Sequence, residues 1–599
     1  MLDLAKLDFY KLKSEFLNMS AGDTVSVDVV LSPSTAILKE DMIECHQLYL
    51  LKELPGGGKI EPTEYKITSV EKVATSEDNI FHIIIADTDA GHGYYDKVQL
   101  CYQKGDYSVI SPPIEIRNSG STLTCFSLSD GSTIWDSFDV RNDTIRVQVP
   151  QSFNLKEATA YFKHNGAYVS LNDEIQESGI GKKDYTDFCN PKVFNVKAFD
   201  GRERKYTIEI FNIPIVFINT PDSIEITSRY EWIGNSSFTI RNTDGIEEDY
   251  GEANVRGRGN WTWRQGLESG KKPYAVKLSI KPKNRTVLGM PGHKRWILLS
   301  NPVSYLPNPV GFEVNRRAET CKWSPRSRFV ELILNGKHQG LYLLCEQIKI
   351  DKNRININEM KNDDTVGEAV TGGYLISYDD AWEDDDPIYR TKYYNIPFMI
   401  KNPDTDDINP DQLNYITNYI NEAELSLYDD EKFNNGEYNN YFDVDSWIDY
   451  YFAAELWGAL EMKEPRSVWL YKDRGGLLTA GPLWDMESNF FHNQQLYCSN
   501  SLYYDRLFQS RDVVDRLKTK WKVFRTNIVG NGKYDSILEY IDSLYEECRF
   551  SADRDRKMTP ASFYGHLPYE ESKLELEYHT IHDNIMMKLD WLENQIMSW

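Results

Sequence analysis

Cysteine and histidine are scarce in this chain, and their spacing excludes several classes of protein. The eight cysteines are spread over 599 residues with no Cys-x-x-Cys pair, and the ten histidines form no His-Glu-x-x-His motif. A disulfide-stapled small scaffold, a cysteine-ligated zinc cage and a zinc metalloprotease all need closer spacing. No Gly-x-Ser-x-Gly elbow is present either, so a serine hydrolase of that type is not supported.

The chain also lacks long apolar runs and an excess of positive charge. No stretch approaches the roughly 18 to 20 apolar residues that span a bilayer, so we expect no transmembrane segment. Acidic residues number 92 against 67 basic ones, which gives a net charge of −25. A negative field of this size repels phosphate backbones, so nucleic acid is not an expected partner. The first residues contain no uninterrupted apolar segment of the kind found in a signal peptide.

Apolar and aromatic residues, in contrast, are plentiful. Hydrophobic residues make up 41% of the chain and aromatic residues 13%. This content supports sizeable cores and excludes a mainly disordered chain. At roughly 150 residues per domain, the length predicts about four structural units in a soluble, multidomain protein.

The first third of the chain has the pattern of β-sheet proteins. Short segments of alternating or continuous apolar residues, such as 24–31, 80–85, 144–149 and 205–210, are separated by turn residues. Such regular strand spacing without helical periodicity predicts two immunoglobulin-like β-sandwiches, at residues 1–118 and 119–218. The run of glycines at 56–58 lacks the spacing of a phosphate loop, so we interpret it as a hairpin turn.

From about residue 219 the pattern changes to an α+β unit, which we divide into a core at 219–500 and a helical part at 501–599. Asn335-Gly336 between two alternating runs predicts a hairpin. Asn409 followed by Pro410 predicts a helix start, and Asp445 is predicted to cap a second helix.

Three segments of this unit carry residues with chemical potential. Arg256 and Arg258 stand among glycines that permit close backbone approach to a polyanion, although the local pattern alone favours a strand-turn-strand with solvated bases. Glu346 lies at the end of a predicted buried strand. It is either a ligand-binding group or a structural acid paired with a base. The acids Glu461, Asp485 and Glu487 could bind Mg²⁺ or Mn²⁺, or two of them could act as the carboxylate pair of a glycosidase. The alternative is that they are ordinary surface acids.

Eight segments in consistent order resemble the CotH family of atypical, secretory-type protein kinases, which is named for a spore-coat protein. The region that resembles the family, from about Asp222 to the C-terminus, is nearly two-thirds of the chain, and its segments are RGRGNWTW, KKPYAVKL, VLGMPGHKRWILLSN, FVELILNGKHQGLYLLCEQIKIDKNRINI, TGGYLISYDD, SWIDYYFAAELWG, SVWLYKDRGG and GPLWDMESNF. The resemblance implies a kinase-like fold that transfers the γ-phosphate of ATP to protein Ser or Thr with Mg²⁺ or Mn²⁺. It also implies a secreted or cell-surface location.

The resemblance assigns roles to individual residues. Lys277 would contact phosphate together with Arg256 and Arg258, and Glu313 or Glu346 would be the carboxylate partner of Lys277. Asp485 and Glu487 would bind the metal ion. Glu461 falls at the catalytic acid, and Ser467 falls where many members have a metal-binding Asn and others have Ser.

Several positions depart from the family pattern. Ala459 replaces the Asn of the catalytic element, Pro307 replaces an Arg, and Ser377 replaces a Glu. Glu487 stands where the family has a second Asp. These departures leave a second hypothesis open, in which a pseudokinase-type surface protein binds a glycan or a protein partner. Trp261 and Trp263 are then the first candidate contacts, with packing in the core as the alternative.

Overall fold

The computed structural model divides the chain into two compact units, residues 1–212 and 213–599. It describes residues 8–12, 16–19, 24–32, 47–53, 59–60, 65–72, 80–87, 95–104, 107–118, 120–198, 201–282, 285–300, 304–380, 387–404, 407–463, 465–486, 494–558 and 573–599. The boundaries of the four domains that we expected from the sequence stay a prediction. The glycine run at 56–58 and Glu487 lie outside the described residues.

Two sheets occupy the start of the first unit. One has the order β1-β3-β7-β6, and the other has the order β2-β10-β8-β4-β5, with β9 paired to β8. Their strands are β1 (Asp8–Leu12), β2 (Phe16–Met19), β3 (Thr24–Ser32), β4 (Leu48–Glu53), β5 (Lys59–Ile60), β6 (Tyr65–Lys72), β7 (Ile80–Asp87), β8 (Tyr95–Lys104), β9 (Tyr107–Ile110) and β10 (Ile114–Asn118). The predicted strands at 24–31 and 80–85 are therefore present.

The rest of the first unit is one sheet with the order β14-β11-β12-β13-β18-β17-β15-β16. Its strands are β11 (Leu123–Ser129), β12 (Ile134–Arg141), β13 (Thr144–Gln148), β14 (Thr159–His164), β15 (Tyr168–Leu171), β16 (Glu174–Gln176), β17 (Val193–Lys197) and β18 (Glu203–Phe211). The β-rich character predicted for residues 1–218 is confirmed, whereas the immunoglobulin-like topology stays a prediction.

The second unit begins with a closed β-barrel in the order β19-β20-β21-β22-β25-β27-β26. Its strands are β19 (Ile215–Asn219), β20 (Ile233–Arg241), β21 (Glu247–Gly257), β22 (Tyr274–Leu278), β25 (Arg295–Leu299), β26 (Ser327–Leu334) and β27 (Lys337–Glu346). A short pair, β23 (Thr286–Val287) and β24 (Met290–Pro291), and helix α1 (Trp261–Ser269) interrupt the chain between barrel strands. The Asn335-Gly336 hairpin between β26 and β27 is confirmed.

Alternation along the barrel strands separates an inner face from an outer one. Val276 belongs to the cluster that fills the barrel, together with Trp263. Its neighbour Ala275 belongs to the large cluster shared with the helices of the unit. Because successive side chains of a strand point to opposite faces, the barrel interior is a packed core and the outer face meets the helical part. The hypothesis that Trp263 offers an exposed ring is wrong, since it is 6% exposed.

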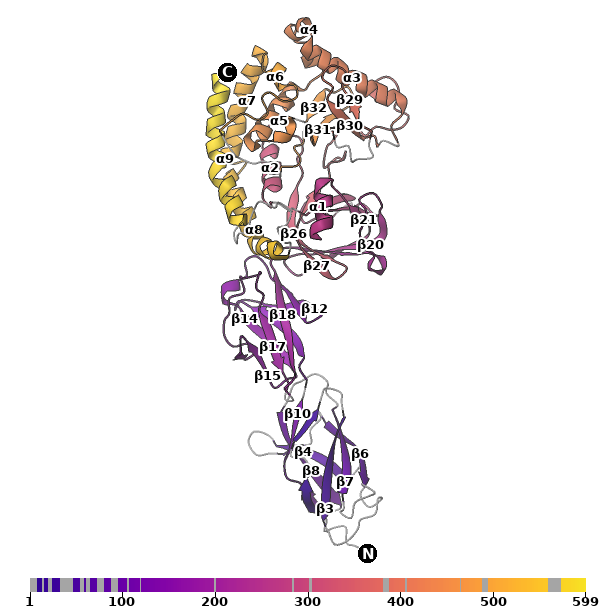
Figure 1. Cartoon of the computed structure of the whole chain (residues 1–599), viewed down its shortest axis with the longest axis vertical. Helices are drawn as coiled ribbons and strands as arrows, with labels where there is room; N and C mark the ends of the chain where they lie inside the picture. The colour runs from indigo at the N-terminus through magenta and orange to yellow at the C-terminus, as the bar shows by residue number, and fades with distance from the viewer. Residues whose placement is uncertain are drawn as a thin grey trace. The chain divides into compact units, whose positions relative to one another are not determined.

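The remainder of the unit is a five-stranded sheet with helices. The sheet has the order β29-β30-β28-β31-β32, formed by β28 (Tyr374–Tyr378), β29 (Tyr389–Arg390), β30 (Pro397–Asn402), β31 (Val468–Lys472) and β32 (Leu478–Ala480). The helices are α2 (Pro307–Arg316), α3 (Pro410–Tyr428), α4 (Asp430–Asn434), α5 (Val444–Trp457), α6 (Tyr504–Leu507), α7 (Arg511–Val529), α8 (Ile537–Met558) and α9 (Lys573–Ser598). Helix α9 packs against α7 and α8 (Figure 1). The predicted helical character of 501–599 is thereby confirmed.

The starts of two helices test the predicted caps. Asn409 forms a capping box with Gln412 at the start of α3, as its position before Pro410 indicated. Helix α5 is instead capped by Asp443, whose side chain accepts a hydrogen bond from the backbone N–H of Ser446. The prediction of Asp445 was therefore wrong by two residues. Among the described helices, none has the length and apolar content needed to cross a bilayer.

Two buried ion pairs join α8 to the barrel. Lys271, which precedes β22, binds Asp555 of α8, and both side chains are almost fully buried. Asp555 also accepts hydrogen bonds from the Tyr305 hydroxyl at 2.8 Å and the Leu341 N–H at 2.9 Å. One residue earlier on α8, Arg554 binds the fully buried Glu331 at 2.5 Å. The end of α8 is thus fixed to β26 and β27 by charge as well as by packing.

Candidate functional site

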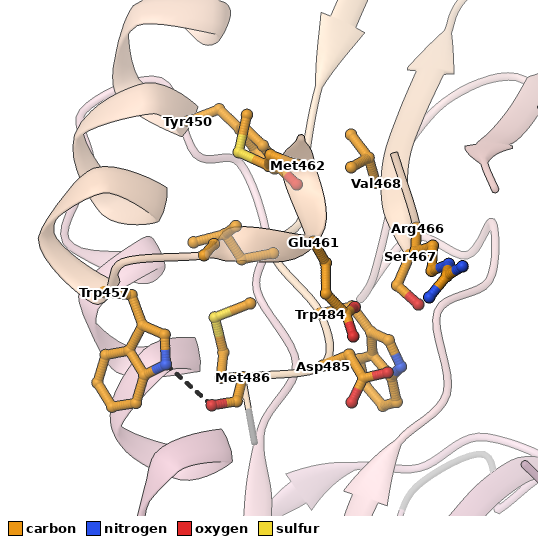
Figure 2. A pocket seen from close by; sticks show the side chains of 12 residues that line it. Tyr450, Trp457, Glu461, Met462, Arg466, Ser467, Val468, Trp484, Asp485 and Met486 are labelled. Carbon is orange, nitrogen blue, oxygen red and sulfur yellow. Dashed lines mark hydrogen bonds between the residues drawn. The ribbon is translucent and has the colours of Figure 1, made fainter. Parts of the chain in front are cut away.

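One pocket collects three of the residues singled out from the sequence. Glu461, Ser467 and Asp485 all line it, together with the side chains of Trp484 and Arg466 (Figure 2). Glu461 lies in the short helix η7 (Leu460–Met462) after α5, and Ser467 immediately precedes β31. Asp485 follows β32 and the Gly481-Pro482 turn. Three separate chain segments therefore converge here.

Asp485 and Ser467 both have left-handed backbone conformations, with φ of 65° and 55°. A residue with a side chain adopts this region at a cost of about 1 to 3 kcal/mol, and such residues concentrate at functional sites. The Ser467 hydroxyl and the Asp485 carboxylate both line the pocket, and the hydroxyl lowers the pKa of the carboxyl group. The two strained positions thus bring two oxygen groups together.

The electrostatic environment of Asp485 combines opposing influences. Protein atoms packed around the carboxylate raise its pKa, while Arg258 and the Ser467 hydroxyl lower it. The residue as a whole remains exposed to solvent. Arg258 also stacks over the Trp484 ring, with 5.9 Å from its guanidinium carbon to the ring centroid. The residue that follows β21 therefore lies beside Trp484, which lines the pocket.

Helix α2 holds the segment that carries Asp485. The Asn308 side-chain oxygen accepts a hydrogen bond from the Met486 N–H at 3.0 Å, and Asn315 accepts one from the Leu483 N–H at 3.1 Å. The Phe312 ring stacks on Trp484 with centroids 5.3 Å apart. Two amides and one ring from the same helix thus fix the backbone on both sides of Asp485.

The Ser467 side of the pocket is held by two acids that follow β28. Asp379 accepts a hydrogen bond from the Ser467 N–H at 3.1 Å. Asp380 pairs with Arg466 at 2.7 Å. These contacts tie the segment before β31 to the end of β28, so the backbone that presents Ser467 is anchored.

The remaining sequence candidates lie on the barrel and on α2. Arg256 donates to the Arg229 carbonyl at 2.6 Å and stacks on Trp232 at 4.7 Å. Lys277 lies on the outer barrel face, since it alternates with Val276 of the inner cluster. Neither predicted acid pairs with Lys277 within the described structure.

Each of those acids instead binds arginines. Glu313 pairs with Arg316 and with Arg317, the latter at 3.0 Å. Glu346 is fully buried and binds Arg326 at 3.2 Å. In the sheet, Glu346 stands opposite Trp296, whose ring belongs to the inner cluster. Glu346 and Lys277 are therefore on opposite faces of the barrel wall.

The donor set of the pocket suits a hard divalent cation. Over the residues that the structure describes, no group of three or more His, Cys, Asp or Glu side chains is arranged to hold a metal ion. Mg²⁺ in phosphoryl-transfer sites commonly has only one or two carboxylates, with phosphate oxygens and water completing its shell. The Asp485 carboxylate and the Ser467 hydroxyl fit that pattern.

Comparison with known families agrees with this arrangement. The model of the family described as "CotH kinase protein" matches residues 255–592, which is more than half of the chain. The chain belongs to the CotH kinase family. No curated protein matches it. All three pocket residues, and the α2 residues that hold Asp485, fall within the part of the chain that the CotH family model matches.

Sequence reasoning missed Asn308, Asn315 and Asp379 as supporting residues. Two of them were close to positions that the resemblance singled out, because Asn308 directly follows Pro307 and Asp379 lies in the segment TGGYLISYDD. Asn315 carried no signal in the sequence, because its role depends on how α2 packs against the turn at 481–486.

Proposed function

We propose that this protein is an ATP-dependent protein kinase that transfers the γ-phosphate to Ser or Thr of a protein substrate with Mg²⁺ or Mn²⁺. The observation that carries the proposal is the convergence of Glu461, Ser467 and Asp485 on one pocket, with Arg258 beside Trp484 of its lining. Phosphoryl transfer depends chiefly on positioning and on charge stabilisation, which these groups supply.

Each group has a distinct role in the proposed reaction. Asp485 and Ser467 hold the metal ion, and the metal ion neutralises phosphate charge when bound. Arg258 contacts phosphate oxygens. Glu461 accepts the proton of the acceptor hydroxyl. The oxygen of that hydroxyl forms a bond to the γ-phosphorus while the bond between the γ-phosphorus and the leaving oxygen of ADP breaks. Glu487 is the second proposed metal ligand. A secreted or cell-surface location belongs to the same proposal.

The experiment that tests it follows label from γ-labelled ATP. The full chain is incubated with Mn²⁺ or Mg²⁺ and a panel of acceptor proteins, beside Asp485→Asn. We expect metal-dependent labelling of protein that the variant lacks. Asp505→Asn serves as a matched control, because Asp505 is an exposed acid of α6 outside the pocket. Label that is equal in Asp485→Asn and in the unsubstituted chain contradicts the proposal.

A second candidate function rests on Ala459, which lines the same pocket where the family has Asn. Without that amide, the domain serves as a pseudokinase that binds a protein or glycan at the cell surface. Ala459→Asn separates the two candidates. In a kinase of low activity, the restored amide increases the labelling rate by about tenfold or more. In a binding protein, neither form labels any acceptor, and binding to a surface partner is the activity that remains.

A further inference from the structure

The outer face of the barrel carries like charges directly opposite each other. In the register of β22 and β25, Lys277 pairs with Arg295. Directly opposed residues of antiparallel strands have Cβ atoms about 4.5 to 5.5 Å apart, and like charges there are destabilising. An acidic protein with a net charge of −25 has ample carboxylates to neutralise such a pair. Its two cations nevertheless face each other.

Neither cation has an acidic partner in the described part of the chain. Among the residues that the structure describes, none forms a hydrogen bond or ion pair with the Lys277 ammonium. The Arg295 guanidinium stacks on Trp232 at 5.3 Å. Burial lowers its pKa while the charge of Asp404 acts to raise it, without an ion pair between these two described side chains. Both side chains are only partly buried. Two cations that are close together, accessible and without a counter-ion form an attractive position for an anion.

Trp232 connects this pair to the phosphate-contacting arginines. Arg256 stacks on the same ring at 4.7 Å. Along β21, Asn254 stands opposite Lys277, and Arg256 follows two residues later on the same face. Arg258, two residues further, contacts Trp484 and influences Asp485. Arg258 is four residues after Asn254, the residue opposite Lys277. Four residues of extended chain span about 13 Å.

We propose that Arg295 and Lys277, oriented by Trp232, form a polyphosphate-binding cradle that continues from Arg256 and Arg258 to Asp485. The ligand is the phosphate chain of a nucleoside triphosphate, so the inference rests on the proposed function and adds Arg295 and Trp232 to its binding residues. Arginine suits this position, because its planar guanidinium stacks on the indole while its N–H groups remain directed at phosphate oxygens.

The test measures binding of ATP and of inorganic tripolyphosphate to the full chain by calorimetry, with and without Mg²⁺. Arg295→Gln and Lys277→Gln are compared with two controls. Arg285→Gln removes an exposed arginine that already pairs with Glu248, and Lys337→Gln removes an exposed lysine at the start of β27. We expect each cradle variant to lose about tenfold or more in affinity for both ligands, and the controls to lose less than twofold.

A second readout distinguishes anion binding from a structural role. Without ligand, removing one of two opposed cations leaves the midpoint of thermal unfolding unchanged or raises it. Saturating tripolyphosphate then raises the midpoint of the unsubstituted chain more than that of Arg295→Gln. Equal shifts overturn the cradle.

The possible failures are distinguishable. If ATP binds and Arg295→Gln retains full affinity for both ligands, the cradle is wrong and the proposed function stands. If tripolyphosphate binds through Arg295 while ATP does not bind, the cradle stands and the ATP-dependent function falls. If the unsubstituted chain binds neither ligand, both are wrong.

Discussion

Ser467 and Asp485 line the same pocket, and both residues hold left-handed backbone conformations. Ser467 immediately precedes β31 and Asp485 follows β32, so the segments flanking two neighbouring strands reach the same pocket. The Asp379 carboxylate and the Asn308 amide fix the two backbones from outside. The local strain at each position is thus balanced by hydrogen bonds from other elements.

Removing the Ser467 hydroxyl tests this relationship. The hydroxyl lowers the pKa of Asp485, so in Ser467→Ala that pKa rises and protonation competes with metal at higher pH. We expect Mn²⁺ affinity to fall by about tenfold near neutral pH, and the pH below which binding is lost to move upward. Titration of Mn²⁺ binding at a series of pH values measures both effects.

Two companion variants control the experiment. Ser467→Asn supplies an oxygen ligand and tolerates the left-handed region, so we expect it to retain binding. Ser543→Ala, on an exposed turn of α8, leaves the curve unchanged. A Ser467→Ala curve identical to that of the unsubstituted chain would exclude a role for the hydroxyl.

Asn308 is expected to act on Asp485 through the backbone. In Asn308→Ala the buried Met486 N–H loses its acceptor, which costs about 1 to 3 kcal/mol of the free energy of unfolding. The left-handed conformation of Asp485 loses its support, so metal affinity falls as well. Asn308→Asp keeps an acceptor oxygen and is expected to retain metal binding. Urea unfolding and Mn²⁺ titration measure the two effects, with Asn414→Ala of α3 as the control. Loss of stability with unchanged metal affinity would refute the positioning role.

The buried pair between Lys271 and Asp555 leads to a prediction about stability. Lys271→Met leaves the Asp555 carboxylate buried with only the Tyr305 and Leu341 donors. Breaking one partner of a buried pair typically costs about 3 to 5 kcal/mol. We expect a decrease of that order in the free energy of unfolding of the second unit, measured by urea unfolding. Lys337→Met removes an exposed lysine from β27 and is the control. A decrease below about 1 kcal/mol in Lys271→Met would contradict the prediction.

We expect Glu547 of α8 to make the free energy of unfolding depend on pH. Burial raises its pKa from 4.5 to about 7, with Arg328 opposing the shift. Because the folded state holds this proton more tightly than the unfolded state, stability is lost as pH rises from about 4.5 to 7. At pH 8 we expect Glu547→Gln to be more stable by about 1 to 2 kcal/mol, allowing for partial exposure, and below pH 4 to be unchanged. Urea unfolding at a series of pH values checks this, and a difference between the variants that is independent of pH would exclude it.

Local signals in the sequence predicted much of the secondary structure. Asn335-Gly336 gave the hairpin because a tight turn needs residues that accept positive φ. Asn409 before Pro410 gave the start of α3. The cap of α5 was misplaced because Asp443 and Asp445 are both suitable residues, and only the geometry at Ser446 selects the first.

The site was predictable only in part, for a physical reason. Family motifs indicated Glu461, Ser467 and Asp485, and these residues share a pocket. The sequence could not show that neither proposed acid pairs with Lys277 in the described structure. Glu346 lies on the opposite face of the barrel wall, and Glu313 binds neighbouring arginines. Pairing across a closed barrel depends on register, which a motif does not encode. The opposed cations Lys277 and Arg295 became visible only from the same register.

The attachment of α8 to the barrel has a consequence for how a ligand would enter and leave this unit. Arg554 and Asp555 are consecutive residues, and each forms a buried ion pair with the barrel. Opening the barrel away from the helices by a hinge would expose both pairs and cost several kcal/mol. We therefore expect the barrel and the helices to move as one body. Ligand exchange in this unit is then expected to proceed by motion of side chains and loops at the pocket mouth.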